Sequence, residues 1–166
     1  LSACGGKKKA SLQAQAVLPD KTLYENGLAY INKGHYLKAR LALQTLINTY
    51  EESEYLEGTK FYIAYSYMRE GGVENLIQAE QGFKDFRLFF PTSELADDAQ
   101  SHVVGINMSL MRAPNRDQTH THKAHIQLRS FIRYFPNSEL MYVMRIRLLY
   151  VEEPLAMSEF LKGNFY

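Results

Sequence analysis

The chain has 166 residues, of which 46% are hydrophobic, and it contains twelve tyrosines, nine phenylalanines and no tryptophan. This hydrophobic content is ordinary for a globular protein, and the length suffices for one core or for a few stacked repeat units. The formal net charge of +1 creates no overall field that would favour a nucleic acid as partner. No apolar run approaches the roughly 20 residues that a membrane-spanning helix needs.

The only cysteine of the sequence, Cys4, lies in the context Leu1-Ser2-Ala3-Cys4, which has the form of a bacterial lipobox. In a lipobox the cysteine sulfur carries a diacylglycerol group, and the amino group usually carries a further acyl chain. The basic and apolar segments that precede a lipobox are not part of this sequence. Gly5 stands where many inner-membrane lipoproteins have aspartate, which favours the outer membrane. We therefore predict a lipid anchor on Cys4; the alternative is a coincidental cysteine in a disordered tail.

Residues 5–19 show no hydrophobic periodicity and are predicted to form a flexible tether. The chain then divides into a lipobox with its tether, residues 1–19, and a helical domain, residues 20–166.

The domain consists of amphipathic segments separated by glycines, prolines and polar turns. The predicted helices cover about residues 21–33, 36–50, 54–69, 73–90, 94–112, 118–135, 139–151 and 155–166. Gly34 and the pair Gly71-Gly72 are predicted to end the first members of two helix pairs. Pro154 is predicted to mark a break or the first turn of the last helix, because proline lacks the N–H that a helix interior needs.

One helix-ending element occurs twice, 45 residues apart, at Pro91 and at Pro136. Each proline follows an aromatic-rich helix and precedes a serine, which can accept hydrogen bonds from the free amides of a following helix. The predicted N-cap residues are Asp20, Ser53, Ser93, Asp117 and Ser138. The spacing indicates repeated helix pairs.

The second helix of each pair carries a shared pattern, in which a small residue is followed by large apolar residues four and seven positions later. The three copies are Ala39-Leu43-Leu46, Ala79-Phe83-Phe86 and Ala124-Leu128-Phe131. These offsets place the residues on one helix face. We predict that this face is buried, with the alanine where a neighbouring helix crosses closely.

Helix pairs in this register match the tetratricopeptide repeat (TPR), in which a helix A is followed by an antiparallel helix B. We therefore predict an all-α TPR solenoid of antiparallel helix pairs. The predicted units are residues 20–52, 53–92 and 93–137, with a partial fourth unit at 138–166. The last helix leaves an apolar face open, which either a continuing chain or a partner covers.

Three histidines, His120, His122 and His125, cluster near the start of one predicted helix. Only two of them share a helix face, and no cysteine completes a metal site, so we interpret them as a solvated face. The sequence also lacks the Gly-rich phosphate loop, the G-x-S-x-G motif and the H-E-x-x-H motif. We predict no enzyme, no metal and no cofactor beyond the lipid on Cys4.

A TPR solenoid offers a concave groove lined by its A helices, and this groove is the candidate binding site. The residues expected to face it are Tyr24, Leu28, Ile31, Phe61, Tyr65 and Met68, together with His102 and Ile106. The alternative is that these side chains fill the core between repeats. An aromatic-lined groove suits an extended or β-like peptide with apolar side chains.

The segment Asn115-Arg116-Asp117-Gln118, followed by a helix that ends in Tyr134-Phe135-Pro136-Asn137-Ser138, resembles the BamD family (also called ComL or YfiO). Members of this family are TPR lipoproteins of the outer-membrane β-barrel assembly (BAM) machine. The lipobox and the first unit, through Gly34-His35-Tyr36-Leu37-Lys38-Ala39, are similar as well, so that the resemblance covers residues 1–166.

The resemblance implies a non-enzymatic scaffold on the periplasmic face of the outer membrane. Its implied partners are the POTRA domains of a BamA-like barrel protein, other BAM lipoproteins and unfolded outer-membrane proteins, whose C-terminal β-signal ends in an aromatic residue. The alternative is another periplasmic TPR lipoprotein that organises cell-wall enzymes or a secretion complex.

Overall fold

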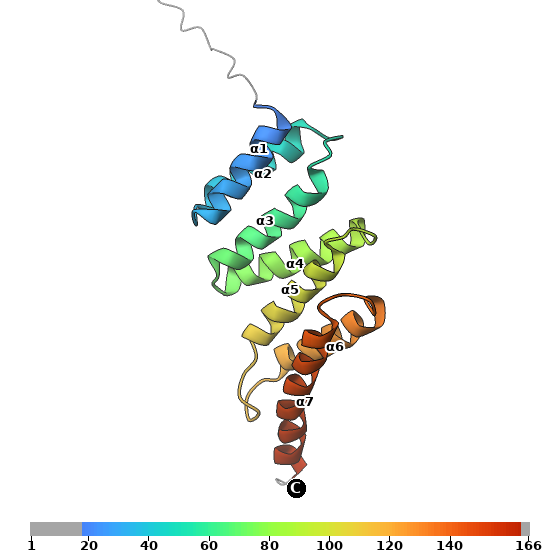
Figure 1. Cartoon of the computed structure of the whole chain (residues 1–166). Helices are drawn as coiled ribbons and strands as arrows, with labels where there is room; N and C mark the ends of the chain where they lie inside the picture. Colours follow the sequence, from blue (N-terminus) through green and yellow to red (C-terminus); the bar gives the residue numbers. More distant parts are fainter. Residues whose placement is uncertain (1–17, 164–166) are drawn as a thin grey trace, which may run out of the picture.

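The computed structural model describes residues 18–163, which form seven α-helices and no strand. The helices are α1 (Asp20–Asn32), α2 (Tyr36–Thr49), α3 (Leu56–Glu70), α4 (Val73–Phe89), α5 (Ala96–Ser109), α6 (Thr119–Tyr134) and α7 (Met141–Gly163). Each helix packs against the next one in the chain, and α1 also contacts α3. The result is an elongated stack with α1 at one end and α7 at the other (Figure 1). The predicted all-α, TPR-like architecture is confirmed.

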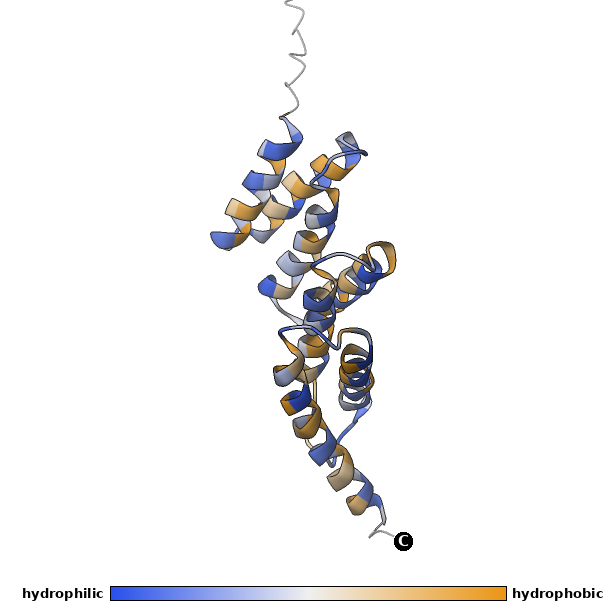
Figure 2. Cartoon of the chain, turned by 45° about the vertical axis from the view of Figure 1, so that its right-hand side comes forward, coloured by the Kyte–Doolittle hydropathy of each residue, from blue (hydrophilic) through white to orange (hydrophobic). Residues whose placement is uncertain are grey.

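The core lies along the B helices α2, α4 and α6. All nine residues of the three-residue pattern are at most 1% exposed. The three alanines allow close helix crossings, while the leucines and phenylalanines fill the space between units. The helices carry both hydrophobic and hydrophilic residues (Figure 2), as expected for helices that bury one face and expose the other.

Glycines make the tight turns within the first two units. Gly34, Gly71 and Gly72 all have positive φ, at 74°, 76° and 82°, in a region that favours glycine. Gly27 serves a different purpose, because a Cβ added there would lie 2.5 Å from a methyl carbon of Leu43. The two helices of the first unit can therefore approach closely only because this residue has no side chain.

The predicted serine caps lie farther from their helices than expected. Ser53, Ser93 and Ser138 each precede by three residues the first residue of the helix that follows. Their hydroxyl oxygens accept a hydrogen bond from the N–H two residues later, at 3.0 to 3.2 Å. The carbonyl oxygen of each serine also accepts the N–H of the first helical residue. Each serine thus closes a tight turn that leads into the helix rather than capping the helix itself.

The same three hydroxyls join consecutive units. Each donates a hydrogen bond to a carboxylate in the A helix of the preceding unit. The pairs are Ser53 with Asp20 at 2.6 Å, Ser93 with Glu57, and Ser138 with Asp97 at 2.6 Å. The bond from Ser53 holds the pKa of Asp20 below its ordinary value. These three hydrogen bonds fix how consecutive units meet.

The two predicted aspartate caps are also displaced. Asp20 is the first residue of α1, and Pro19 occupies the N-cap position. Asp117 lies two residues before α6 and accepts hydrogen bonds from the N–H and the hydroxyl of Thr119, at 3.0 and 2.7 Å. Gln118 is therefore the N-cap residue of α6.

The predicted break at Pro154 is wrong, because α7 is one continuous helix of 23 residues with this proline inside it. Proline in a helix interior costs about 3 kcal/mol. Apolar packing on both sides of the proline offsets this cost, and Val151, which lies before it, is fully buried. After the proline, Leu155 packs against the buried hydrophobic cluster that α7 shares with α5 and α6.

Candidate functional site

A cavity of about 460 Å³ opens between the A helices α1, α3 and α5. Its lining combines aliphatic, aromatic and a few polar side chains. The lining residues are Leu28, Ile31, Asn32, Phe61, Tyr62, Tyr65, Leu95, Asp98 and His102. We call this space the A-helix cavity.

Four of the six residues predicted to line the binding groove meet in the A-helix cavity, namely Leu28, Ile31, Phe61 and Tyr65. His102, the further residue expected to face the groove, lines it as well. Their convergence follows from the repeat, because equivalent faces of successive A helices turn to the same side of a solenoid.

The other expected groove residues lie elsewhere. Tyr24 stacks on Tyr55, with ring centroids 5.1 Å apart. Met68 packs against the core cluster of the second unit, and Ile106 is 2% exposed within that core. Sequence reasoning missed the lining residues Asn32, Tyr62, Leu95 and Asp98. Tyr62 could have been found, since it lies three residues before Tyr65 and so on the same helix face.

Two of the lining residues also belong to the core. Ile31 is 4% exposed and Phe61 is 5% exposed. The ring of Phe61 packs edge-on against that of Phe83, with centroids 5.3 Å apart. These two side chains form the floor of the cavity and cannot be changed without disturbing the packing between units.

The walls are aromatic and held in place. The Tyr65 ring lies nearly parallel to that of Phe61, at 6.4 Å, and Tyr62 meets the same ring edge-on at 5.4 Å. Arg69 donates a hydrogen bond of 3.1 Å to the Tyr65 hydroxyl. This bond and the surrounding rings restrict the Tyr65 side chain before any ligand arrives, which reduces the entropy lost on binding.

The polar residues of the cavity come from α5. Burial raises the pKa of the half-buried Asp98 carboxyl, and the adjacent Asp97 carboxylate raises it further. Burial lowers the pKa of His102, and the positive charge of Arg147 lowers it further. His102 is therefore neutral near pH 7, and its ring lies 4.9 Å from that of Phe83 and 5.6 Å from that of Tyr65.

The histidine cluster differs from the expected solvated face. Only His122 is exposed; His120 and His125 are half-buried. His120 lies 3.2 Å from the Asn107 amide oxygen on α5, and His125 lies 3.3 Å from Glu152 on α7. Within residues 18–163, no three histidine, cysteine or acidic side chains are placed to hold a metal ion. These two histidines link α6 to its neighbours.

Residues 17–166 match the model of the YfiO family, which is described as an outer membrane lipoprotein. The chain belongs to the YfiO family. The resemblance that the sequence motifs indicated is confirmed, and the family description associates the chain with the outer membrane. Among the described residues, no helix combines the length and the apolar composition needed to cross a membrane.

A similar curated protein is the outer membrane protein assembly factor BamD of Pasteurella multocida, which is 24% identical over 177 residues. The match covers 100% of this chain and 65% of that protein. The chain therefore spans about two thirds of the length of this relative.

The loop between α5 and α6 carries the motif that most resembled the YfiO family, and its backbone is held by a buried side chain. The Gln118 amide donates hydrogen bonds to the carbonyl oxygens of Ala113 and Arg116, at 2.7 and 3.1 Å. Thr121 in turn donates to the Gln118 amide oxygen at 2.9 Å. The motif thus specifies the shape of a loop.

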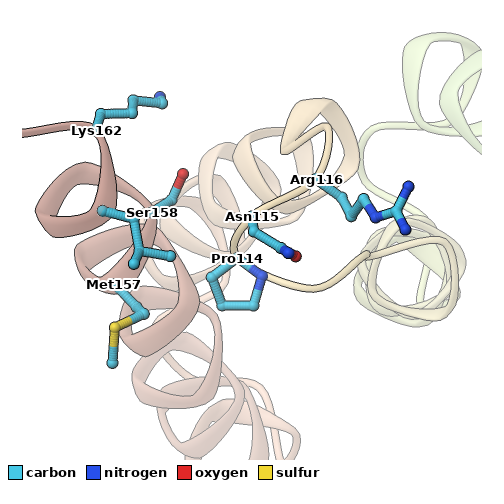
Figure 3. Close-up of a pocket in the computed structure, with 7 residues that line it drawn as sticks. Pro114, Asn115, Arg116, Met157, Ser158 and Lys162 are labelled. Atoms are coloured by element: carbon cyan, nitrogen blue, oxygen red, sulfur yellow. The ribbon is translucent and has the colours of Figure 1, made fainter. Parts of the chain in front are cut away.

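A second cavity, of about 540 Å³, lies between this loop and the end of α7. Pro114 and Asn115 face Met157 and Ser158 across it, while the Arg116 side chain points away from α7 (Figure 3). Lys162 at its rim is paired with Glu159 at 3.0 Å. We place the candidate site at the A-helix cavity instead, because most of the residues predicted to face the groove meet there.

Proposed function

We propose that this protein is a non-enzymatic scaffold in the assembly of outer-membrane β-barrel proteins, lipid-anchored through Cys4 on the periplasmic face of the outer membrane. Membership of the YfiO family supports this proposal, as does the name of the Pasteurella multocida relative, an assembly factor. Cys4 lies outside the described residues, so the anchor rests on the lipobox and on the family. Beyond this lipid we propose no cofactor.

The A-helix cavity is the observation that carries the proposed binding role. It joins three helices, its floor is apolar and its walls are aromatic rings fixed by neighbouring contacts. Its volume falls within the ~300–1,000 Å³ typical of small-ligand pockets, which admits one or two large side chains but no folded domain. We propose that it binds the aromatic side chain of an extended β-signal in an unfolded outer-membrane protein.

The proposed partners are tested by isolating the complex. The chain, expressed behind a lipoprotein leader and extracted in mild detergent, is expected to co-purify with a POTRA-containing barrel protein, because a BAM scaffold must contact the subunit that forms the barrel. Mass spectrometry of the eluate identifies the partners. Recovery of cell-wall hydrolases without any barrel protein would contradict the proposal and favour the alternative scaffold.

The cavity itself is tested with Tyr65→Leu, which removes the ring and hydroxyl but keeps an apolar side chain. We expect a loss of about tenfold in affinity for a β-signal peptide that contains an aromatic residue, since one aromatic contact contributes about 1.5 kcal/mol. Fluorescence anisotropy with a labelled peptide measures the change.

The matched control is Tyr67→Leu on the same helix. Tyr67 lies outside the cavity lining, beneath Arg40, whose guanidinium carbon is 4.2 Å from the ring centroid. Its substitution should leave peptide affinity near that of the wild type. Equal losses in both variants, or unchanged affinity in Tyr65→Leu, would place the peptide site elsewhere.

A further inference from the structure

The A-helix cavity contains a carboxylate that an apolar ligand does not explain. Asp98 lies in the first turn of α5 and lines the cavity together with the aromatic residues Tyr62 and Tyr65. Among residues 18–163, the side chain of Asp98 has no salt-bridge partner and accepts no hydrogen bond from another side chain. This is unlike its neighbour Asp97, which accepts hydrogen bonds from the Ser138 hydroxyl and from the Asp98 N–H.

Among the residues that line the cavity, Asp98 is the one that carries a charge. On α5 it is accompanied by Asp97 and by neutral His102, and α3 contributes the phenols of Tyr62 and Tyr65 to the same lining. The lining residues that come from α1 carry no charge; they are Leu28, Ile31 and Asn32. Arg147 of α7 influences His102 but does not line the cavity.

We propose that the A-helix cavity selects a basic side chain next to the aromatic anchor of the bound segment, with Asp98 as the ion-pair partner of that cation. The inference rests on the proposed function and specifies its ligand. A lysine or arginine in this position would meet both a carboxylate and the faces of aromatic rings, two kinds of group that attract cations.

The same carboxylate excludes a free C-terminus from the cavity. A terminal carboxylate placed here would meet Asp98 with a like charge, in a partly buried position where water screens the repulsion poorly. The cavity therefore takes an internal aromatic–basic pair of an extended segment, and the end of the chain lies outside it.

Matched peptides of about ten residues test the selection. They share one alternating sequence with a single aromatic residue and carry lysine, glutamine or glutamate two positions away, which is the spacing of side chains on one face of a strand. For wild-type protein we expect the lysine peptide to bind about tenfold more tightly than the glutamine peptide, the size expected for one partly buried charged contact. The glutamate peptide should bind most weakly.

The decisive variant is Asp98→Asn, compared with Glu94→Gln as a control. Glu94 is exposed, lies four residues earlier and does not line the cavity, so its substitution removes the same charge from the same region. We expect Asp98→Asn to bind the three peptides about equally while keeping the affinity for the glutamine peptide, and Glu94→Gln to retain the wild-type preference. A preference that persists in Asp98→Asn, or that is absent from the wild type, would overturn the inference.

Two further measurements sharpen the test. A peptide whose aromatic residue is C-terminal should bind more tightly as the amide than as the free acid; the reverse order would overturn the inference.

The ionised Asp98 carboxylate destabilises the folded protein, because burial raises the pKa of this carboxyl. Above that pKa, Asp98→Asn should therefore unfold at an equal or slightly higher temperature, and a markedly lower one would show that Asp98 is structural. Failure of every peptide to bind the wild type would instead refute the proposed peptide-binding function, and the inference with it.

Discussion

Phe83→Ala is expected to lower the free energy of unfolding by about 3–5 kcal/mol, because it removes a fully buried ring and leaves a cavity. The Phe83 side chain is 0% exposed at the centre of the second unit. It packs against Phe61 of α3 at 5.3 Å and against His102 of α5 at 4.9 Å. The ring therefore joins three helices, and its loss affects the contacts both within the unit and with the following one. Urea unfolding followed by circular dichroism measures the change.

Phe89→Ala is the matched control, since the same residue type occurs on the same helix but is 65% exposed. The Lys60 ammonium lies 5.2 Å from its ring centroid, and an exposed cation–π contact contributes about 0.5–1 kcal/mol. The expected loss is thus no more than about 1 kcal/mol. Equal losses for the two variants would contradict the assignment of the core to the repeated face of α4.

In a solenoid, the destabilisation caused by Phe83→Ala should be largest near the substituted residue. Each unit contacts only its neighbours, so destabilisation spreads by nearest-neighbour contacts. Hydrogen exchange in Phe83→Ala should accelerate most in α3, α4 and α5, and less in α7, which packs on α6. Uniform acceleration through the whole chain would indicate a single cooperative unit instead.

The repeated face could be predicted because one physical cause acts on one short segment. Ala79, Phe83 and Phe86 recur with the helical period, and a helix that packs on its neighbours must bury that face. The same holds for the turns at Gly34 and Gly71, whose positive φ values limit the residue type. In these places the residues that determine the structure lie within a few positions of each other.

The remaining features depend on residues that are far apart in sequence. The bond from Ser138 to Asp97 spans 41 residues, and no local pattern indicates it. In the sequence, Asp98 resembles an ordinary acidic residue in the first turn of a helix, where the helix dipole favours a negative charge. Its place in a cavity depends on how α5 packs beside α3, which the sequence leaves open.

Pro154 illustrates a different limit. Local rules predict a break because proline removes a backbone hydrogen bond, yet α7 continues through it. Apolar packing of Val151 and Leu155, on either side of the proline, supplies the stabilisation that the local rule omits. Tertiary packing therefore decided the length of this helix.

Cys4→Ser is expected to have the largest effect on location. With a lipoprotein leader placed ahead of Leu1, the wild-type protein should remain in the membrane pellet after a carbonate wash, whereas the variant should appear in the soluble fraction. Each buried CH₂ of the acyl chains contributes about 0.8 kcal/mol to the free energy of membrane binding, so that several chains together hold the protein firmly. A serine at this position cannot receive the lipid. The membrane-bound fraction should fall at least about a hundredfold, measured by immunoblotting of the fractions.

Ser2→Ala is the matched control, because it changes the lipobox but keeps a small residue at that position. It should remain in the pellet like the wild type. The carbonate wash is essential to the experiment, since it strips proteins held only by other proteins and so separates a lipid anchor from attachment to a barrel partner. Retention of Cys4→Ser after this wash would contradict the anchor, and it would then be the protein contacts of the solenoid that keep the chain at the membrane.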